Sequence, residues 1–136
     1  MAKQPVLDIL IVDDELDIPL ALSLMLRELA EVNISVVVDG QEAMDALTDT
    51  KFDLLFLDLH LPIVTGEKIL DAIAAGEGNI QKPGHIIVMS TGSRLHELQT
   101  GLSAGVIDGL LEKPFQYSDL QGIIADVMTG DFLSGD

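Results

Sequence analysis

Hydrophobic residues along the chain form short continuous runs that alternate with longer amphipathic stretches. Short apolar runs are typical of buried strands, and apolar residues at helical spacing between them are typical of helices packed on a sheet. The pattern predicts strands at residues 6–12, 34–38, 53–58, 86–90 and 107–112. It predicts helices at residues 16–31, 41–50, 65–75, 95–104 and 117–128.

The alternation of these elements predicts an α/β fold, because strand–helix–strand units build mostly parallel sheets. The first helix carries apolar residues at helical spacing, which predicts a broad face packed against the sheet. Its Pro19 is tolerated only in the first turn, so we expect this helix to begin close to Asp17. The apolar face would consist of Leu20, Leu22, Leu24, Met25, Leu26 and Leu29.

The predicted elements account for nearly the whole chain of 136 residues, which is the length of one ordinary domain. They occupy residues 6–128 and leave residues 129–136 as a short tail. No internal repeat or interdomain linker interrupts them. We therefore expect one domain over residues 1–136 without an output domain, and Met1 together with the short tail favours a complete gene product.

The composition excludes several classes of protein. Hydrophobic residues make up 48% of the chain, but no apolar run approaches the roughly 20 residues that a membrane span needs. The N-terminus has neither the basic nor the apolar segment of a secretory signal. The absence of cysteine excludes disulfides, thiolate metal sites and a cysteine nucleophile. We expect a soluble, cytoplasmic protein that does not act at a membrane.

The net charge of −16 argues against a nucleic-acid surface, which needs clustered lysine and arginine. The seven basic residues are instead scattered along the chain. Acidity of this size mainly favours solubility, and it could also steer basic partners. We expect no nucleic-acid partner.

Polar residues stand at the C-terminal ends of four predicted strands. They are Asp13 and Asp14 after the first strand, Asp58 after the third, Thr91 after the fourth and Lys113 after the fifth. The carboxyl ends of parallel strands meet at one edge of the sheet, which is where open α/β sheets place their ligands. Carboxylates suit a hard cation such as Mg²⁺, and an ammonium suits a phosphoryl group. This edge is therefore the candidate site.

Taken singly, each of these residues also has an ordinary structural interpretation. Asp13 or Asp14 could simply cap the next helix, and a strand-end Thr91 is a common β-former. A lone lysine at a strand end is usually just exposed, although Pro114 makes the chain turn directly after Lys113. Their occurrence together at one predicted edge favours a functional site.

Five motifs follow one another in order along the chain. They are Asp13-Asp14, Asp58 with Leu61-Pro62, Gly66, Thr91, and Lys113-Pro114-Phe115. This ordered set resembles the receiver domain of two-component response regulators, the CheY-like fold, over about residues 6–128. The resemblance implies a flavodoxin-like, doubly wound (βα)5 fold. Such a fold is a three-layer sandwich in which helices cover both faces of a parallel five-stranded sheet of order 2-1-3-4-5.

The resemblance implies that Asp58 is the phosphoacceptor, whose carboxylate attacks the phosphorus of a phosphohistidine donor and forms an acyl phosphate. It implies that Asp14 and the Asp58 side chain bind Mg²⁺ directly. Asp13 would bind through water, and the backbone carbonyl of His60 would complete the protein ligands. Mg²⁺ would offset the repulsion among the carboxylates and orient the in-line transfer.

The resemblance also implies that Lys113 holds one phosphoryl oxygen as a point charge. The Thr91 hydroxyl would donate to another oxygen, with the N–H of Gly92 as a further donor. The phosphoryl group would come from a sensor histidine kinase or a histidine phosphotransfer protein, and a downstream protein would read the phosphorylated state. The protein would then be a switch or a phosphorelay intermediate rather than an enzyme.

Three positions depart from the usual pattern of the family. Gly92 stands where alanine is usual, and Leu110 stands where many members carry an aromatic switch residue. We therefore expect the switch to act by reorganising residues 91–105 and the face made by the fourth helix, fifth strand and fifth helix. His60 occupies a position that affects the lifetime of the acyl phosphate, although it could equally be a half-exposed loop histidine.

Two other functions are open. An aspartyl phosphatase would use Asp58 as its nucleophile, but such enzymes commonly carry a second carboxylate two residues later, where this chain has His60. A receiver that binds partners without phosphorylation would have lost the aspartate or the lysine, and this chain keeps both. A single-domain phosphoacceptor is the favoured function.

Overall fold

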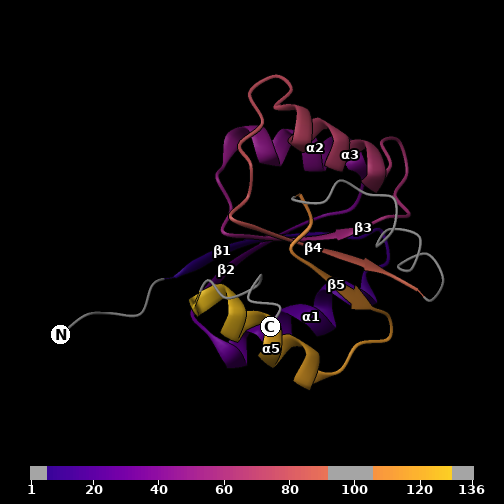
Figure 1. The fold of residues 1–136 in the computed structure, drawn as a ribbon. Helices are drawn as coiled ribbons and strands as arrows, with labels where there is room; N and C mark the ends of the chain where they lie inside the picture. Colours follow the sequence, from indigo (N-terminus) through magenta and orange to yellow (C-terminus); the bar gives the residue numbers. More distant parts are fainter. Residues whose placement is uncertain (1–5, 92–105, 130–136) are drawn as a thin grey trace.

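The computed structural model describes residues 6–91 and 106–129 (Figure 1). The strands form one sheet in which each neighbouring pair is parallel, in the order β2-β1-β3-β4-β5. The strands are β1 (Leu7–Val12), β2 (Val32–Val37), β3 (Leu54–Asp58), β4 (His85–Ser90) and β5 (Gly109–Glu112). The described helices, labelled as in Figure 1, are α1 (Asp17–Leu29), α2 (Gly40–Asp49), α3 (Gly66–Ala75) and α5 (Tyr117–Thr129).

The predicted fold class and strand order are confirmed, and α1 begins at Asp17 as expected from Pro19. Three strands start within one residue of the predicted position, and two start two residues away from it. The strand predicted from residue 34 begins at Val32, because Val32 and its polar neighbour Asn33 already pair with β1. The strand predicted from residue 107 begins at Gly109, and the Asp108 carboxylate there accepts the N–H of Ile86 at 2.8 Å. The helix predicted at residues 95–104 and the tail beyond Thr129 lie outside the described residues.

The helices cover both faces of the sheet, with α2 and α3 on one side and α1 and α5 on the other (Figure 1). Alternate residues of β1 point to opposite faces, so Leu10 packs with the α2 and α3 core and Ile11 with the α1 and α5 core. Both are fully buried, as is Phe56 in the middle of β3. Burial on two faces explains why the central strands are continuous apolar runs rather than alternating ones.

The start of α2 and the start of α3 are each fixed by a side-chain cap. The Asp39 carboxylate accepts the N–H of Glu42 at 2.8 Å, and the Glu42 carboxylate accepts the N–H of Val38 at 3.1 Å. The two bonds resemble a capping box, except that Glu42 binds the N–H of the residue before the N-cap rather than that of Asp39 itself. The Thr65 hydroxyl accepts the N–H of Lys68 at 3.3 Å. The caps define where the turns after β2 and β3 end, and the turn after β3 follows directly on the predicted site residue Asp58.

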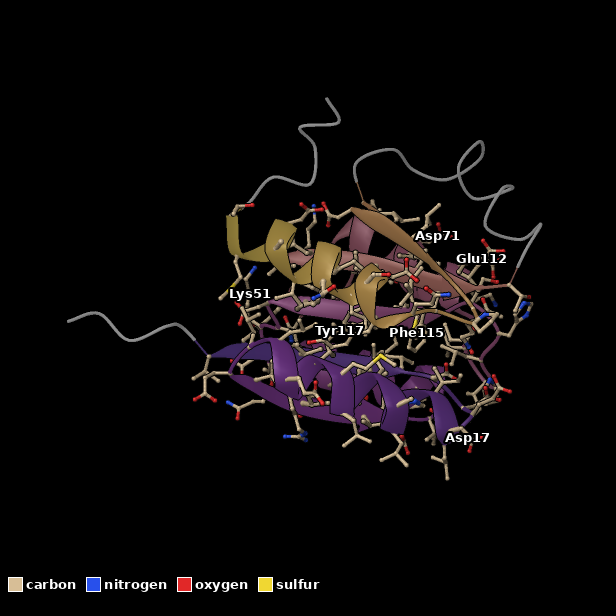
Figure 2. The ribbon with its side chains drawn as sticks, turned by 90° about the horizontal axis from the view of Figure 1, so that it is seen from below. Asp17, Lys51, Asp71, Glu112, Phe115 and Tyr117 are labelled. Carbon is tan, nitrogen blue, oxygen red and sulfur yellow. The ribbon has the colours of Figure 1, made fainter. Side chains whose placement is uncertain are left out.

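Helix α1 buries a narrower face than the sequence pattern predicts. Pro19, Leu22 and Leu26 are buried against the sheet, but Leu20 and Leu24 are 63% and 59% exposed. The prediction that these two leucines pack inward is therefore wrong. A residue two positions along a helix points roughly 200° away, so Leu20 and Leu22 cannot both face the sheet. Figure 2 views the molecule from the side of α1 and α5, with Asp17 and Tyr117 labelled where the two helices begin.

Two leucines of α1 offer a matched test of this geometry. Leu22→Ala should destabilise the protein by about 2 to 5 kcal/mol, because it leaves a cavity in a closed core. Leu20→Ala should change the free energy of unfolding by less than about 0.5 kcal/mol, since its side chain already contacts solvent. Urea denaturation followed by circular dichroism measures both. Equal losses for the two variants would contradict the orientation of the helix.

Candidate functional site

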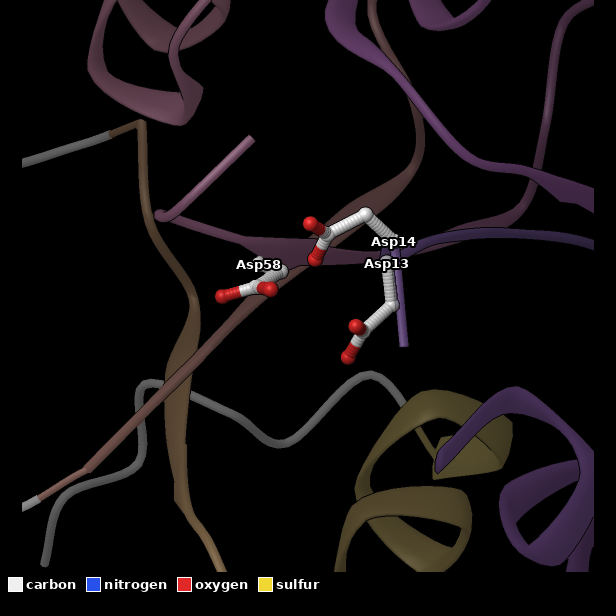
Figure 3. A group of neighbouring side chains, drawn as sticks. All are labelled: Asp13, Asp14 and Asp58. Carbon is white, nitrogen blue, oxygen red and sulfur yellow. The ribbon is translucent and has the colours of Figure 1, made fainter. Parts of the chain in front are cut away.

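Three aspartates meet at the C-terminal edge of the sheet (Figure 3). Asp13 follows β1 and is fully buried, Asp58 ends β3 and is almost fully buried, and Asp14 is exposed. One carboxylate oxygen from each residue lies within 4.8 Å of the others. The parallel sheet brings these residues together from positions 45 apart in the chain, as the strand-end pattern predicts.

Lys113 supplies the positive charge at this edge. Its Nζ lies 2.8 Å from Asp13 Oδ2, 3.5 Å from Asp58 Oδ2 and 3.6 Å from Glu15 Oε1. The backbone N–H of Lys113 donates to the carbonyl of Ser90 at 2.9 Å, which holds the residue beside the end of β4. The bond between Lys113 and the exposed Pro114 is cis.

Short backbone hydrogen bonds orient the two buried carboxylates. Asp13 Oδ1 accepts the N–H of Glu15 at 2.9 Å, and Asp58 Oδ1 accepts the N–H of His60 at 3.1 Å. Each bond links a carboxylate to the backbone two residues later, which is an Asx turn. Because each Oδ1 is engaged, the Oδ2 atoms of both aspartates are the ones that face Lys113.

A pocket of about 320 Å³ opens beside these groups. It is lined by five of the predicted site residues, which are Asp14, Asp58, His60, Thr91 and Lys113. Among them, Asp58 is buried whereas Thr91 and the His60 side chain are exposed. The pocket is therefore open to a ligand that comes from solvent and reaches the Asp58 carboxylate.

Two residues that border this pocket were not expected from the sequence. Glu15 follows Asp14 directly and faces Lys113, and its position in the same strand-to-helix turn could have indicated this. Ser90 precedes Thr91, and its buried Oγ has no hydrogen-bond partner among the described residues. Nothing in the pattern of β4 distinguishes Ser90 from an ordinary strand residue.

Of the two predicted switch positions, the structure describes Leu110 but not Gly92. Gly92 lies outside the described residues, as does every residue except Thr91 in the segment 91–105 that is expected to reorganise. Leu110 is half-buried and packs against the core on the α2 and α3 side of the sheet.

Burial and charge act in opposite directions on the two ionisable groups at the centre of the site. Burial raises the pKa of Asp58, and the His60 N–H lowers it. The negative charge of Asp13 also raises the pKa of Asp58, whereas Lys113 lowers it. The net shift of this pKa is upward. Burial lowers the pKa of Lys113, but the Asp13 hydrogen bond and the charges of Asp58, Asp13 and Glu15 raise it above its usual value. Lys113 is therefore a stable cation, and the ionised form of Asp58 is less favourable than that of an exposed aspartate.

The donor set fits a hard divalent cation. Carboxylate oxygens are the ligands that Mg²⁺ prefers, and one or two carboxylates with retained waters are typical of its sites. The buried Asp13 and Asp58 lie beside the exposed Asp14, so the cluster combines strong negative charge with access from solvent. A cation here would offset the repulsion that raises the pKa of Asp58.

Comparison with known proteins identifies the class to which this fold and site belong. The family model for the response regulator receiver domain matches residues 9–125. The chain therefore belongs to the response regulator receiver domain family, whose members act in two-component signalling. The resemblance inferred from the strand-end motifs is confirmed.

Individual relatives agree with this assignment. The transcriptional regulatory protein PrrA of Mycobacterium leprae is 32% identical over 112 residues, which cover 82% of this chain and 46% of PrrA. The response regulator ArlR of Staphylococcus aureus is 31% identical over 120 residues, which cover 88% of this chain and 52% of ArlR. The chain thus spans about half the length of the curated relatives it matches.

Two solved structures are also similar. The receiver domain of the sensor histidine kinase PA1611 from Pseudomonas aeruginosa, determined with a magnesium ion in its active site cleft, is 26% identical with a TM-score of 0.73. The alignment covers 92% of this chain and 99% of that one. The chemotaxis protein CheY4 of Vibrio cholerae is 26% identical with a TM-score of 0.74, over 90% of this chain and 99% of CheY4. None of the described helices has the length and apolar character that a membrane crossing needs.

The raised pKa of Asp58 predicts a stability gain when its charge is removed. In metal-free protein at neutral pH, Asp58→Asn should increase the free energy of unfolding, because the ionised carboxylate is less favourable in the folded state than in the unfolded state. The gain should shrink as the pH falls through the raised pKa towards 3.8, where wild-type Asp58 takes up its own proton.

The matched control is Asp71→Asn on the exposed surface of α3, which removes one charge from a residue that belongs neither to the pocket nor to the carboxylate cluster. Urea denaturation in EDTA at several pH values measures both variants. If Asp58→Asn lowers stability at neutral pH, or if its gain persists in acid, the electrostatic description of the site is wrong.

Proposed function

We propose that this chain accepts a phosphoryl group on Asp58 from a phosphohistidine of a sensor histidine kinase or a histidine phosphotransfer protein. The observation that carries the proposal is a buried carboxylate, in contact with a lysine, at the bottom of an open pocket. An Asp58 oxygen attacks phosphorus, the P–N bond to the donor imidazole breaks, and an acyl phosphate forms. The released imidazole nitrogen takes a proton from solvent.

The proposed cation is Mg²⁺, with Asp14 and Asp58 as direct ligands, Asp13 as a ligand through water and the His60 carbonyl as the fourth protein group. Support comes from the carboxylate cluster and from the magnesium-containing relative. When bound, Mg²⁺ supplies positive charge to the carboxylates and to the oxygens of the transferring group. The two Asx turns hold Asp13 and Asp58 in place, so little rearrangement is needed when the cation arrives.

Lys113 and Thr91 are proposed to hold the phosphoryl group after transfer. The Lys113 Nζ is already 3.5 Å from Asp58 Oδ2, so an oxygen of a phosphoryl group on Asp58 would lie within its reach. Thr91 lines the same pocket with a hydroxyl donor, and the N–H of Gly92 is a further proposed donor. Charge-assisted hydrogen bonds of this kind are about twice as strong as neutral ones.

The donor protein is proposed to contact the exposed face of α1. A phosphohistidine can reach Asp58 only if its own protein covers the rim of the pocket. Glu15 is part of that rim, and the apolar side chains that continue from it along the helix are exposed at Leu16, Leu20 and Leu24. They lie four residues apart on one face, which suits an apolar helix of the donor.

The chain is proposed to act as a switch rather than as a turnover enzyme, because the acyl phosphate is itself the signal. A downstream protein would read it on the face made by the predicted fourth helix, β5 and α5. The absence of a nucleic-acid partner stays a prediction from the −16 charge, since one of the longer relatives is a transcriptional regulatory protein. The expectation of a stand-alone receiver also stays a prediction, because those relatives are about twice as long as this chain.

Chemical phosphorylation tests the acceptor. Incubation with acetyl phosphate and Mg²⁺ should add one phosphoryl group to the wild-type chain, and peptide mapping should locate it on Asp58. Asp58→Asn and wild-type protein in EDTA should stay unlabelled, whereas Asp71→Asn should label normally. Intact-mass spectrometry measures the product. Labelling of Asp58→Asn to the wild-type extent would falsify the assignment.

The donor contact has a separate test. The double variant Leu20→Ser, Leu24→Ser should receive phosphate at least about tenfold more slowly from any phosphorylated histidine kinase that charges the wild-type chain, because the apolar contact is lost. Its labelling by acetyl phosphate should be unchanged. Met128→Ser, which alters an exposed apolar residue of α5, is the control. Equal kinase rates for the double variant and the control would rule out α1 as the contact face.

A further inference from the structure

The loop between β3 and α3 makes an unusual turn close to the site. Ile63 has a φ of 71°, a left-handed conformation that is unfavourable for a β-branched residue. The N–H of Val64 donates to the carbonyl of Pro62 at 2.8 Å, which closes a three-residue turn around Ile63. A γ-turn with positive φ is the rarer and strained form. Such strain persists only where surrounding contacts hold the backbone in place.

One of those contacts comes from α2. The N–H of Gly40, the first residue of α2, donates to the same Pro62 carbonyl at 3.2 Å. The first N–H groups of a helix have no partner within the helix and attract oxygen atoms. The position of Gly40 is set independently of the loop, because the two hydrogen bonds made by the Asp39 and Glu42 carboxylates fix where α2 begins.

The approach between α2 and the loop leaves no room for a side chain. A Cβ added at Gly40 would overlap the carbonyl oxygen of Val64 and lie 2.6 Å from the Val64 Cβ. The loop is held just as closely at its far end. The N–H of Gly66 donates to the carbonyl of Leu59 at 3.2 Å, and a Cβ at Gly66 would lie 2.6 Å from the carbonyl oxygen of Asp58.

We infer that Gly40 is a positioning residue for the cation site, which acts by holding the strained β3–α3 loop through Pro62. The inference rests on the proposed function, because it concerns the Mg²⁺ site described there. The held loop begins at Asp58 and contains His60, whose N–H orients the Asp58 carboxylate. Without the contact, Ile63 relaxes to a negative φ, and the backbone from His60 onward moves away from Asp13 and Asp14. The cation then has to order the loop as it binds, which lowers its affinity.

The first test compares two glycine-to-alanine variants of the full chain. Gly40→Ala should weaken Mg²⁺ binding by about 10- to 100-fold, the usual effect of losing support around a metal ligand. Gly122→Ala is the control, because a Cβ at Gly122 meets nothing within 4 Å. An NMR titration with MgCl₂, read from the amide shifts of residues 58–66, measures the affinity. Amide exchange in EDTA should be faster for Gly40→Ala over the same residues.

A second pair of variants acts at the loop itself and does not disturb the core, because Ile63 is 77% exposed. Ile63→Gly permits a positive φ and should retain the wild-type Mg²⁺ affinity. Ile63→Pro forces φ to about −65° and should weaken binding to the same extent as Gly40→Ala. This pair decides the question if Gly40→Ala fails to fold.

The outcomes separate the two proposals. Wild-type protein that gives no response to Mg²⁺ would contradict the proposed function and this inference with it. Wild-type protein that binds Mg²⁺, together with Gly40→Ala and Ile63→Pro variants that bind it equally well, would overturn the positioning role alone. Weaker binding by both variants, with Gly122→Ala and Ile63→Gly unchanged, supports it.

Discussion

The concentration of negative charge around one ammonium is the constraint on which the rest of this structure depends. Oxygens of Asp13, Asp14 and Asp58 lie within 4.8 Å of one another, and Lys113 reaches two of these residues. Carboxylates this close repel each other, the more so because two of them are buried. The arrangement is tolerable because the parallel sheet, which has a large apolar core on each face, stabilises the fold independently of the site.

The same charges suit the site to its proposed chemistry. The Lys113 ammonium lies closest to Asp13 and farther from Asp58. Asp13 therefore holds the ammonium, and the Asp58 carboxylate stays available for the proposed reaction. The upward shift in the pKa of Asp58 means that the folded protein favours any event that lowers the charge density there. Binding of a divalent cation is such an event, and so the stability of the fold and its affinity for the cation are linked.

Backbone geometry around the site complements these charges. Asx turns hold Asp13 and Asp58, and α2 contacts the strained turn at Ile63 through Pro62. None of these contacts belongs to the hydrophobic core. They fix the positions of the site residues and contribute less to the stability of the whole fold. Rigid support of this kind reduces the ordering cost of binding a ligand.

The sequence by itself determined the fold class and most of the site. Apolar runs locate central strands because both faces are buried, and the strand-end residues Asp13, Asp58 and Lys113 converge once the strands are parallel. Only the tertiary structure decided that Leu20 is exposed, that Glu15 faces Lys113 and that α2 contacts the β3–α3 loop. Periodicity reports the average environment of a segment, whereas these features depend on helix rotation and on contacts between residues far apart in the chain.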